Sequence, residues 1–245
     1  MSNTFTEKFM ASEKNLSFLK ATMWGPNGIR QAEELASYFR ITEDMTILDL
    51  GCGMGVSAVY LAKAHGSRVF ATDLFADPTE NHENFESLGV ADKIIPMLLD
   101  ATQPLPFAKS YFDVIFSVGA YNMFGDTEGM LPKLIPYVKK GGYIAVAFPG
   151  LKYEFGDNVP PEMQRFWEAP DVARCVHGIE WWKNLFSKAD GIEIINIGEQ
   201  LCHDIAWEEY IASIDPDSEE KWTLDMMEAE AGKYFNTIRL IAKVI

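Results

Sequence analysis

Apolar residues occur along the chain in two spacings, which alternate from residue 45 onward. Short runs rich in β-branched and aromatic residues predict strands, whereas longer runs with apolar residues three or four positions apart predict helices. The predicted strands cover residues 46–48, 67–72, 93–98, 112–117, 143–148, 192–197 and 234–245. Helices are predicted at 27–40, 56–66, 77–89 and 221–233, among others. This alternation predicts an α/β fold with a doubly wound, mainly parallel seven-stranded sheet and helices on both faces.

The length of 245 residues suits a single domain. Within it, residues 1–44 predict N-terminal covering helices, 45–148 a ligand-binding core and 179–245 the C-terminal part of the sheet with acidic helices. Residues 149–178 depart from the alternation and contain a Pro-Pro pair and four aromatic residues. This segment predicts an inserted cap after the fifth strand, and we expect it to roof a small-ligand site.

A glycine-rich turn joins the first predicted strand to the helix after it, with the sequence Asp49-Leu50-Gly51-Cys52-Gly53-Met54-Gly55. Such a loop allows a sharp backbone turn and a close approach by a ligand, and the helix N-terminus behind it offers unpaired N–H groups. Dinucleotide loops have the spacing G-x-G-x-x-G, but here it is G-x-G-x-G. A diphosphate would also be repelled by the carboxylate of Asp49.

This stretch resembles the motif of class I S-adenosylmethionine-dependent methyltransferases, and the resemblance extends over residues 45–148. It implies that Gly51, Cys52, Gly53 and Gly55 carry the methionine moiety and that Asp49 meets its amino group. The branch resembled is the small-molecule one, with quinone-biosynthesis and cyclopropane-synthase-like enzymes. In that fold the last strand is antiparallel, and we expect segment 234–245 to lie at the sheet edge.

Two further acids support a nucleoside site. Asp73 ends the second predicted strand, about twenty residues past the loop, where a carboxylate binds both ribose hydroxyls, and Leu74 beside it can pack on adenine. An acid at the position of Asp73 fits a dinucleotide-binding protein as well as a methyltransferase, so it does not distinguish the two. Asp100 and Ala101 follow the third strand, where the resemblance implies contacts to the adenine amino group and ring, so Asp100 favours the methyl donor.

The remaining candidates surround the transferable methyl group. The fourth predicted strand ends at Ser117, and the loop after it carries Tyr121 and Asn122, which we expect to face the methyl acceptor. Trp24 precedes a helix and would give a sulfonium an aromatic face, while His177 is a candidate general base. Core or turn roles remain open for Trp24, Tyr121 and Asn122, and a structural role for His177.

Composition limits the partners. Asp and Glu number 36 against 21 Lys and Arg, a net charge of −15 that disfavours nucleic acid, and the loop after strand 112–117 lacks the Asn/Asp-Pro-Pro-aromatic tetrad of nucleic-acid amino methyltransferases. Three widely spaced cysteines suggest a reducing, cytoplasmic location and no metal site. We see no membrane span or signal peptide, and we expect a monomer or homodimer.

The sequence therefore predicts a methyltransferase that uses S-adenosylmethionine, releases S-adenosylhomocysteine and methylates a small or lipid-like molecule. Two alternatives stay open. One is an NAD(P)-dependent oxidoreductase, which would share the strand-loop-helix unit and Asp73. The other is a non-catalytic interaction protein that binds S-adenosylmethionine. Neither the acceptor nor its reacting atom can be deduced from these residues.

Overall fold

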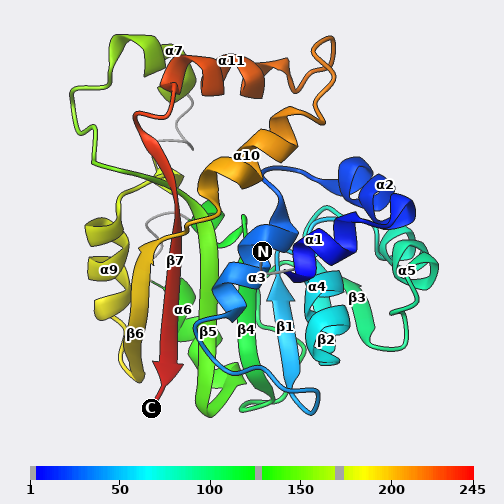
Figure 1. Ribbon diagram of the computed structural model, residues 1–245. Helices are drawn as coiled ribbons and strands as arrows, with labels where there is room; N and C mark the ends of the chain where they lie inside the picture. Colours follow the sequence, from blue (N-terminus) through cyan, green and yellow to red (C-terminus); the bar gives the residue numbers. More distant parts are fainter. Residues whose placement is uncertain (1–3, 125–128, 169–173) are drawn as a thin grey trace.

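The computed structural model describes residues 4–124, 129–168 and 174–245, and Figure 1 shows the strands of its central sheet side by side, with helices around them. Seven strands pair in the order β3-β2-β1-β4-β5-β7-β6. Strands β1 to β5 are mutually parallel, and β7 is antiparallel to both of its neighbours. The strands are β1 (Thr46–Leu50), β2 (Arg68–Asp73), β3 (Ile94–Leu98), β4 (Phe112–Val118), β5 (Val138–Leu151), β6 (Ile192–Glu199) and β7 (Phe235–Val244). The predicted fold class is confirmed.

The predicted place of the last strand was wrong. β7 lies between β5 and β6, and the strands at the two edges are β3 and β6. The burial pattern gives the physical reason, because Ile238, Leu240, Ile241 and Ala242 are all fully buried. Side chains on both faces of this strand are thus buried, as expected for an interior strand with helices on both faces of the sheet.

Helices cover both faces of the sheet, as predicted. Helices α3 (Gly28–Ala36), α4 (Val56–His65) and α5 (Pro78–Ser87) pack on one face, in a cluster that contains Ile47 and Val114. Helices α6 (Met130–Leu134) and α9 (Ile179–Ser187) pack on the other, in a cluster that contains Leu48 and Ile115. Consecutive residues of one strand thus enter opposite clusters, because side chains alternate along a strand.

The N-terminal segment forms two helices, α1 (Phe5–Met10) and α2 (Glu13–Thr22). The carboxylate of Glu33 on α3 accepts hydrogen bonds from the backbone N–H groups of Phe5 and Thr6 at 2.7 and 2.9 Å. These N–H groups have no partner inside α1 because they lie in its first turn. Glu33 therefore fixes α1 against α3.

A small third cluster lies beyond the carboxyl end of the sheet, where β5 and β7 continue as a pair as far as Leu151 and Phe235. Figure 1 shows α7 (Gln164–Trp167) and α11 (Lys221–Glu230) side by side there, above α10 (His203–Ile211). Short 3-10 turns occur at Tyr121–Phe124, Ile135–Tyr137 and Pro161–Met163. Residues 169–173 of the expected cap lie outside the described residues.

We expect Gly55→Ala to lower the free energy of unfolding by about 2–5 kcal/mol, from left-handed backbone strain plus overpacking. Gly55 has a φ of +84°, and a Cβ there would lie 2.4 Å from the ring of buried Phe85. The matched control is Gly89→Ala. Gly89 has a φ of +69°, and a Cβ there would have no atom within 4 Å, so strain alone predicts a loss of about 1–2 kcal/mol in the free energy of unfolding. Urea unfolding measures both, and equal losses would contradict the packing role of Gly55.

Candidate functional site

A cavity of about 640 Å³ opens at the carboxyl ends of β1, β2, β3 and β4. Its lining comes from the glycine loop, from the segments after β2, β3 and β4, from residues 22–31 and from α10 and α11. Ligands of open α/β sheets bind in this position, beyond the strand ends and near the point where the strand order reverses. The volume lies within the usual range for small-molecule sites.

The glycine loop is fastened to the end of β2. Gly51 and Cys52 donate backbone hydrogen bonds to the carbonyl oxygen of Thr72 at 2.8 and 3.0 Å. Gly51, Gly53 and Gly55 all have positive φ, at 70°, 52° and 84°. Other residues rarely adopt this conformation, so the loop needs glycine at all three positions.

The space beside these glycines is occupied by the protein itself. A Cβ on Gly51 would lie 2.2 Å from the Cβ of Ala120, and one on Gly53 would meet the ring of Trp24 at 3.4 Å. Gly51, Cys52 and Gly53 line the cavity, whereas Gly55 does not. Gly55 is therefore a packing residue, and our expectation that each glycine makes room for a ligand was wrong for Gly55.

Asp73 lies at the mouth of the cavity and is hydrogen-bonded on both oxygens. Its Oδ2 accepts from the N–H of Gly53 at 2.9 Å, and its Oδ1 accepts from the N–H groups of Phe75 and Ala76 at 2.8 and 3.1 Å. The carboxylate thus fixes the glycine loop and the turn after β2 together. A carboxylate has about four acceptor positions, so one position is left for a hydroxyl group of a ligand.

The segment after β3 forms the neighbouring wall. Asp100, Ala101 and Leu74 all line the cavity. The Oδ1 of Asp100 accepts from the N–H and the hydroxyl of Thr102 at 2.9 and 2.7 Å, and these bonds lower the pKa of that carboxyl. Leu74 and Phe75 are 49% and 81% exposed, so this wall offers unburied apolar surface to a flat ring.

Asp49 lies beneath the cavity and is absent from its lining. It is fully buried, and its Oδ2 accepts a hydrogen bond from Ser57, which does line the cavity, at 2.6 Å. Burial, with a smaller contribution from the charge of Asp73, raises the pKa of Asp49 to about 7. Its Oδ1 is buried without a hydrogen-bond partner. Because Asp49 does not line the cavity, it can act on a ligand only through Ser57, at the start of α4, which does.

The three residues at the end of β4 have separate roles. Ser117 is buried, is not in the lining, and donates to the carbonyl oxygen of Leu50 at 2.7 Å, which joins β4 to β1. Tyr121 is 2% exposed and packs against Phe148, with its pKa raised by burial. Asn122 lines the cavity, and its Oδ1 is buried without a partner. Of these three residues, Asn122 alone can meet a ligand there.

The structure places His177 away from the cavity. Its ring stacks on that of Trp181 at 3.7 Å between centroids, and its Nδ1 lies 3.1 Å from the Oε2 of Glu154. His177 is not among the lining residues. The contacts fix the start of α9, so the general-base role expected from the sequence finds no geometric support.

The sequence analysis missed much of the roof. Trp207 and Tyr210 of α10, and Trp222, Thr223 and Met226 of α11, line the cavity, while Pro149 alone does so among the described residues of 149–178. The expected cap instead packs behind α11, where Phe155 and Phe166 belong to the third cluster. The available signal was the aromatic content of the two acidic helices, to which we assigned no ligand-binding role.

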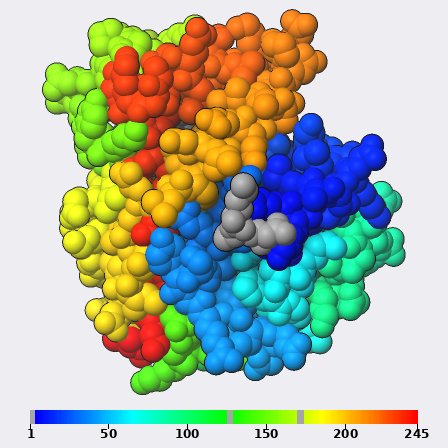
Figure 2. Space-filling view, viewed as in Figure 1, coloured from blue at the N-terminus to red at the C-terminus, as the bar shows by residue number. Residues whose placement is uncertain are grey.

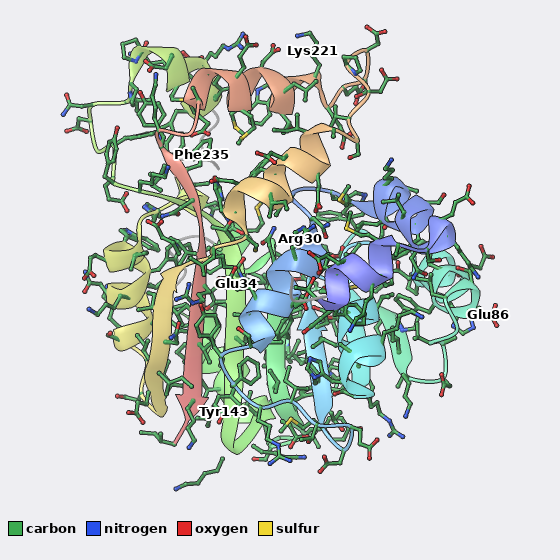
Figure 3. The ribbon with its side chains drawn as sticks, in the orientation of Figure 1. Arg30, Glu34, Glu86, Tyr143, Lys221 and Phe235 are labelled. Carbon is green, nitrogen blue, oxygen red and sulfur yellow. The ribbon has the colours of Figure 1, made fainter. Side chains whose placement is uncertain are left out.

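Residues on α3 hold α10 in place. Arg30 donates from Nε and Nη2 to the carboxylate of Glu209 at 2.7 and 2.6 Å. Glu34 accepts from the N–H groups of Leu201 and Cys202, both at 2.8 Å. Figure 3 shows Arg30 and Glu34 where α3 meets the start of α10, and Figure 2 shows α10 and α11, in orange, above the blue N-terminal helices. The roof is therefore joined to the N-terminal segment that carries Trp24.

Asp73 and Asp100 are the charged residues in the lining, and both are acidic. In the described ranges, no group of three or more His, Cys, Asp and Glu residues could hold a metal ion. None of the helices in the described part of the chain has the length and apolar composition needed to cross a bilayer.

Comparison with known proteins identifies residues 47–142 as a match to a family described as "Methyltransferase domain". Methyltransferase GfsG of Streptomyces halstedii is 26% identical over 71% of this chain and 63% of its own length. The 2-methyl-6-phytyl-1,4-hydroquinone methyltransferase of Synechocystis is 30% identical over 60% of this chain and 43% of its own. The chain thus spans less than two thirds of the length of either relative.

One solved structure with the same fold is the geranyl diphosphate C-methyltransferase of Streptomyces coelicolor, in complex with Mg²⁺, geranyl diphosphate and S-adenosylhomocysteine. It aligns with a TM-score of 0.67 over 88% of this chain and 78% of that one, at 17% identity. At this identity the likeness concerns the fold alone.

We expect Asp49→Asn to gain stability relative to the unmodified protein as the pH rises from 5 to 8. The folded-state pKa of about 7 lies above the usual value near 3.9, so the fold favours the protonated carboxyl of Asp49. The stability that this protonation contributes is present in acid and is lost as the pH rises through 7. The slope cannot exceed about 1.4 kcal/mol per pH unit for one proton.

The control is Asp44→Asn, because the Thr42 hydroxyl holds the pKa of exposed Asp44 below its usual range. For that variant the difference from the unmodified protein should stay constant between pH 5 and 8. Urea unfolding at each pH gives both comparisons, and a constant difference for Asp49→Asn as well would contradict the raised pKa.

Proposed function

We propose that this chain, a member of the class I S-adenosylmethionine-dependent methyltransferase family, binds S-adenosylmethionine and transfers its methyl group to a small-molecule acceptor. One observation carries the proposal: Asp73 and Asp100, from the ends of β2 and β3, line a single cavity with the glycine loop. Each of these groups suits a different part of one nucleoside ligand.

The residues present fit this cofactor. Asp73 is placed to accept from a ribose hydroxyl, and Asp100 with Ala101 and exposed Leu74 lines the neighbouring wall, where a purine ring can lie. The end of α4 offers Ser57 above the carboxyl of Asp49. A cationic amino group bound near Ser57 would favour the ionised form of that carboxyl and make its burial less costly.

When bound, S-adenosylmethionine supplies an electrophilic methyl group on a sulfonium. The protein binds and orients the two reactants, because holding them in line can lower the activation barrier by roughly 7–11 kcal/mol. Trp24, over the glycine loop, offers a cation an aromatic face. Trp207 and Met226 line the cavity from α10 and α11 and offer it apolar surface.

We place the acceptor at the end of the cavity bounded by Asn122 and by the roof of α10 and α11. Asn122 remains our candidate for a residue that touches the acceptor. Tyr121 and His177 are assigned to packing, because neither lines the cavity. The monomeric or dimeric state and the cytoplasmic location remain predictions from the sequence.

Calorimetric titration tests the proposed function directly. We expect S-adenosylhomocysteine to bind at micromolar concentration, and NAD and NADP to show no binding, because the lining has no basic residue for a diphosphate. Binding of a dinucleotide instead would favour the oxidoreductase alternative. Cofactor binding with no transfer to any acceptor in a labelled-methyl screen would favour the non-catalytic alternative.

Asp73→Asn should weaken S-adenosylhomocysteine binding by roughly 10- to 150-fold, from the loss of charged hydrogen bonds. The matched control is Asp77→Asn, four residues further along. It removes the same charge from a carboxylate that caps α5 through the N–H of Thr79 at 2.7 Å and lies outside the cavity lining. Asparagine caps helices equally well, so this control should bind with unchanged affinity. Equal affinity of the two folded variants would refute the ribose assignment.

A further inference from the structure

The acceptor end of the cavity has walls of aromatic, aliphatic and amide side chains. Trp207 and Tyr210 come from α10, and Trp222 and Met226 come from α11. The nucleoside end, around Asp73 and Asp100, holds both charged residues of the lining. The two ends therefore differ in the chemistry that they can bind.

No lysine, arginine or histidine lines the cavity anywhere in the described residues. The sequences of the three other segments, 1–3 (MSN), 125–128 (GDTE) and 169–173 (APDVA), also contain none. A phosphate, diphosphate or carboxylate on the acceptor would thus be buried without a cationic side chain to pair with, which is costly. The net charge of −15 adds long-range repulsion.

A cationic acceptor is disfavoured for another reason. The acceptor must approach a sulfonium closely, and two positive charges a few ångströms apart repel each other strongly in a site of low dielectric constant. A protonated amine also has no lone pair with which to attack the methyl carbon. Charge of either sign is therefore unfavourable on the reacting part of the acceptor.

Two amide side chains of the cavity lining are available for polar contacts with a ligand. The Oε1 of Gln31 and the Oδ1 of Asn122 are buried and have no hydrogen-bond partner, and both residues line the cavity. Gln31 donates from Nε2 to the carbonyl oxygen of Pro26 at 3.1 Å, which identifies its other amide atom as the oxygen. A buried oxygen without a partner is unfavourable, and a ligand that carries a donor relieves it.

We propose that the acceptor is uncharged and largely apolar, and that it carries a hydroxyl group whose hydrogen bond is accepted by the side-chain amides of Asn122 and Gln31. The inference rests on the proposed function, because it takes the nucleoside end to be filled by the cofactor. It makes Asn122 and Gln31 residues that determine acceptor specificity.

The test uses four probes with one ring system: 2-naphthol, 2-methoxynaphthalene, 2-naphthyl phosphate and trimethyl(2-naphthyl)ammonium. Each is titrated into protein saturated with S-adenosylhomocysteine, and the quenching of tryptophan fluorescence is followed. We expect 2-naphthol to bind roughly 5- to 30-fold tighter than the ether, the contribution of one hydrogen bond to a buried acceptor. The anion should bind at least about tenfold more weakly than 2-naphthol. The ammonium probe is compared in protein saturated with S-adenosylmethionine, whose sulfonium would repel it, and it should bind there at least about tenfold more weakly than to the S-adenosylhomocysteine complex.

Asn122→Leu, which keeps the side-chain volume, should reduce the preference for the hydroxyl over the ether to about twofold or less. Its affinity for S-adenosylhomocysteine should stay within about twofold. Gln31→Leu is the second variant, should Asn122→Leu fail to fold, and circular dichroism monitors folding. A large loss of cofactor affinity in either folded variant would assign these amides to the cofactor and overturn the proposal.

The remaining outcomes are also decisive. Failure of S-adenosylhomocysteine to bind the unmodified protein would overturn the proposed function itself. If it binds, equal affinity for naphthol and ether, tighter binding of the phosphate or the ammonium probe, or no binding of 2-naphthol would overturn only the inference about the acceptor. Persistence of the hydroxyl preference in both leucine variants would remove Gln31 and Asn122 from the acceptor site.

Discussion

The site depends on the attachment of the glycine loop to the end of β2. The carbonyl oxygen of Thr72 accepts from two N–H groups of the loop, and the carboxylate of Asp73 accepts from a third. These bonds hold the chain in a left-handed conformation at three glycines, which other residues would adopt only with strain. Because the same carboxylate also holds the turn after β2, the glycine loop and the carboxylate proposed to bind the ribose are fixed together. The cofactor end therefore needs little rearrangement to bind.

The acceptor end is held by long-range contacts instead. Arg30 and Glu34 of α3 fix the start and one side of α10, and α11 rests on a small cluster with the residues around Phe155. The contacts of Arg30 and Glu34 join parts of the chain more than 160 residues apart. The roof is therefore positioned by the completed fold, whereas the glycine loop is positioned by its own strand and the neighbouring one.

This difference explains what the sequence could predict. The seven strands and the two-sided helical cover follow from local patterns and are confirmed, although β5 begins five residues before the predicted strand and ends three residues after it. Asp73 and Asp100 line the cavity beside the ends of β2 and β3, while their binding roles stay predictions. The burial of Asp49, the interior place of β7 and the absence of His177 from the cavity depend on which distant segments pack together. Hydrophobic spacing does not encode that pairing. An apolar helix face has the same sequence pattern whether it covers a core or a cavity. The spacing of the aromatic residues of α10 therefore did not identify them as cavity-lining residues.

The connection between β6 and β7 has a wider consequence. These strands are antiparallel neighbours, which a turn of two residues could join, yet residues 200–234 lie between them. That long excursion builds the roof over the acceptor, while the glycine loop, Asp73 and Asp100 lie in other parts of the chain. An excursion between two paired strands can be lengthened, shortened or replaced with little effect on the sheet. The fold thus separates a constant part from an exchangeable one, and descendants of one ancestor can diverge in what they modify while they retain the same donor.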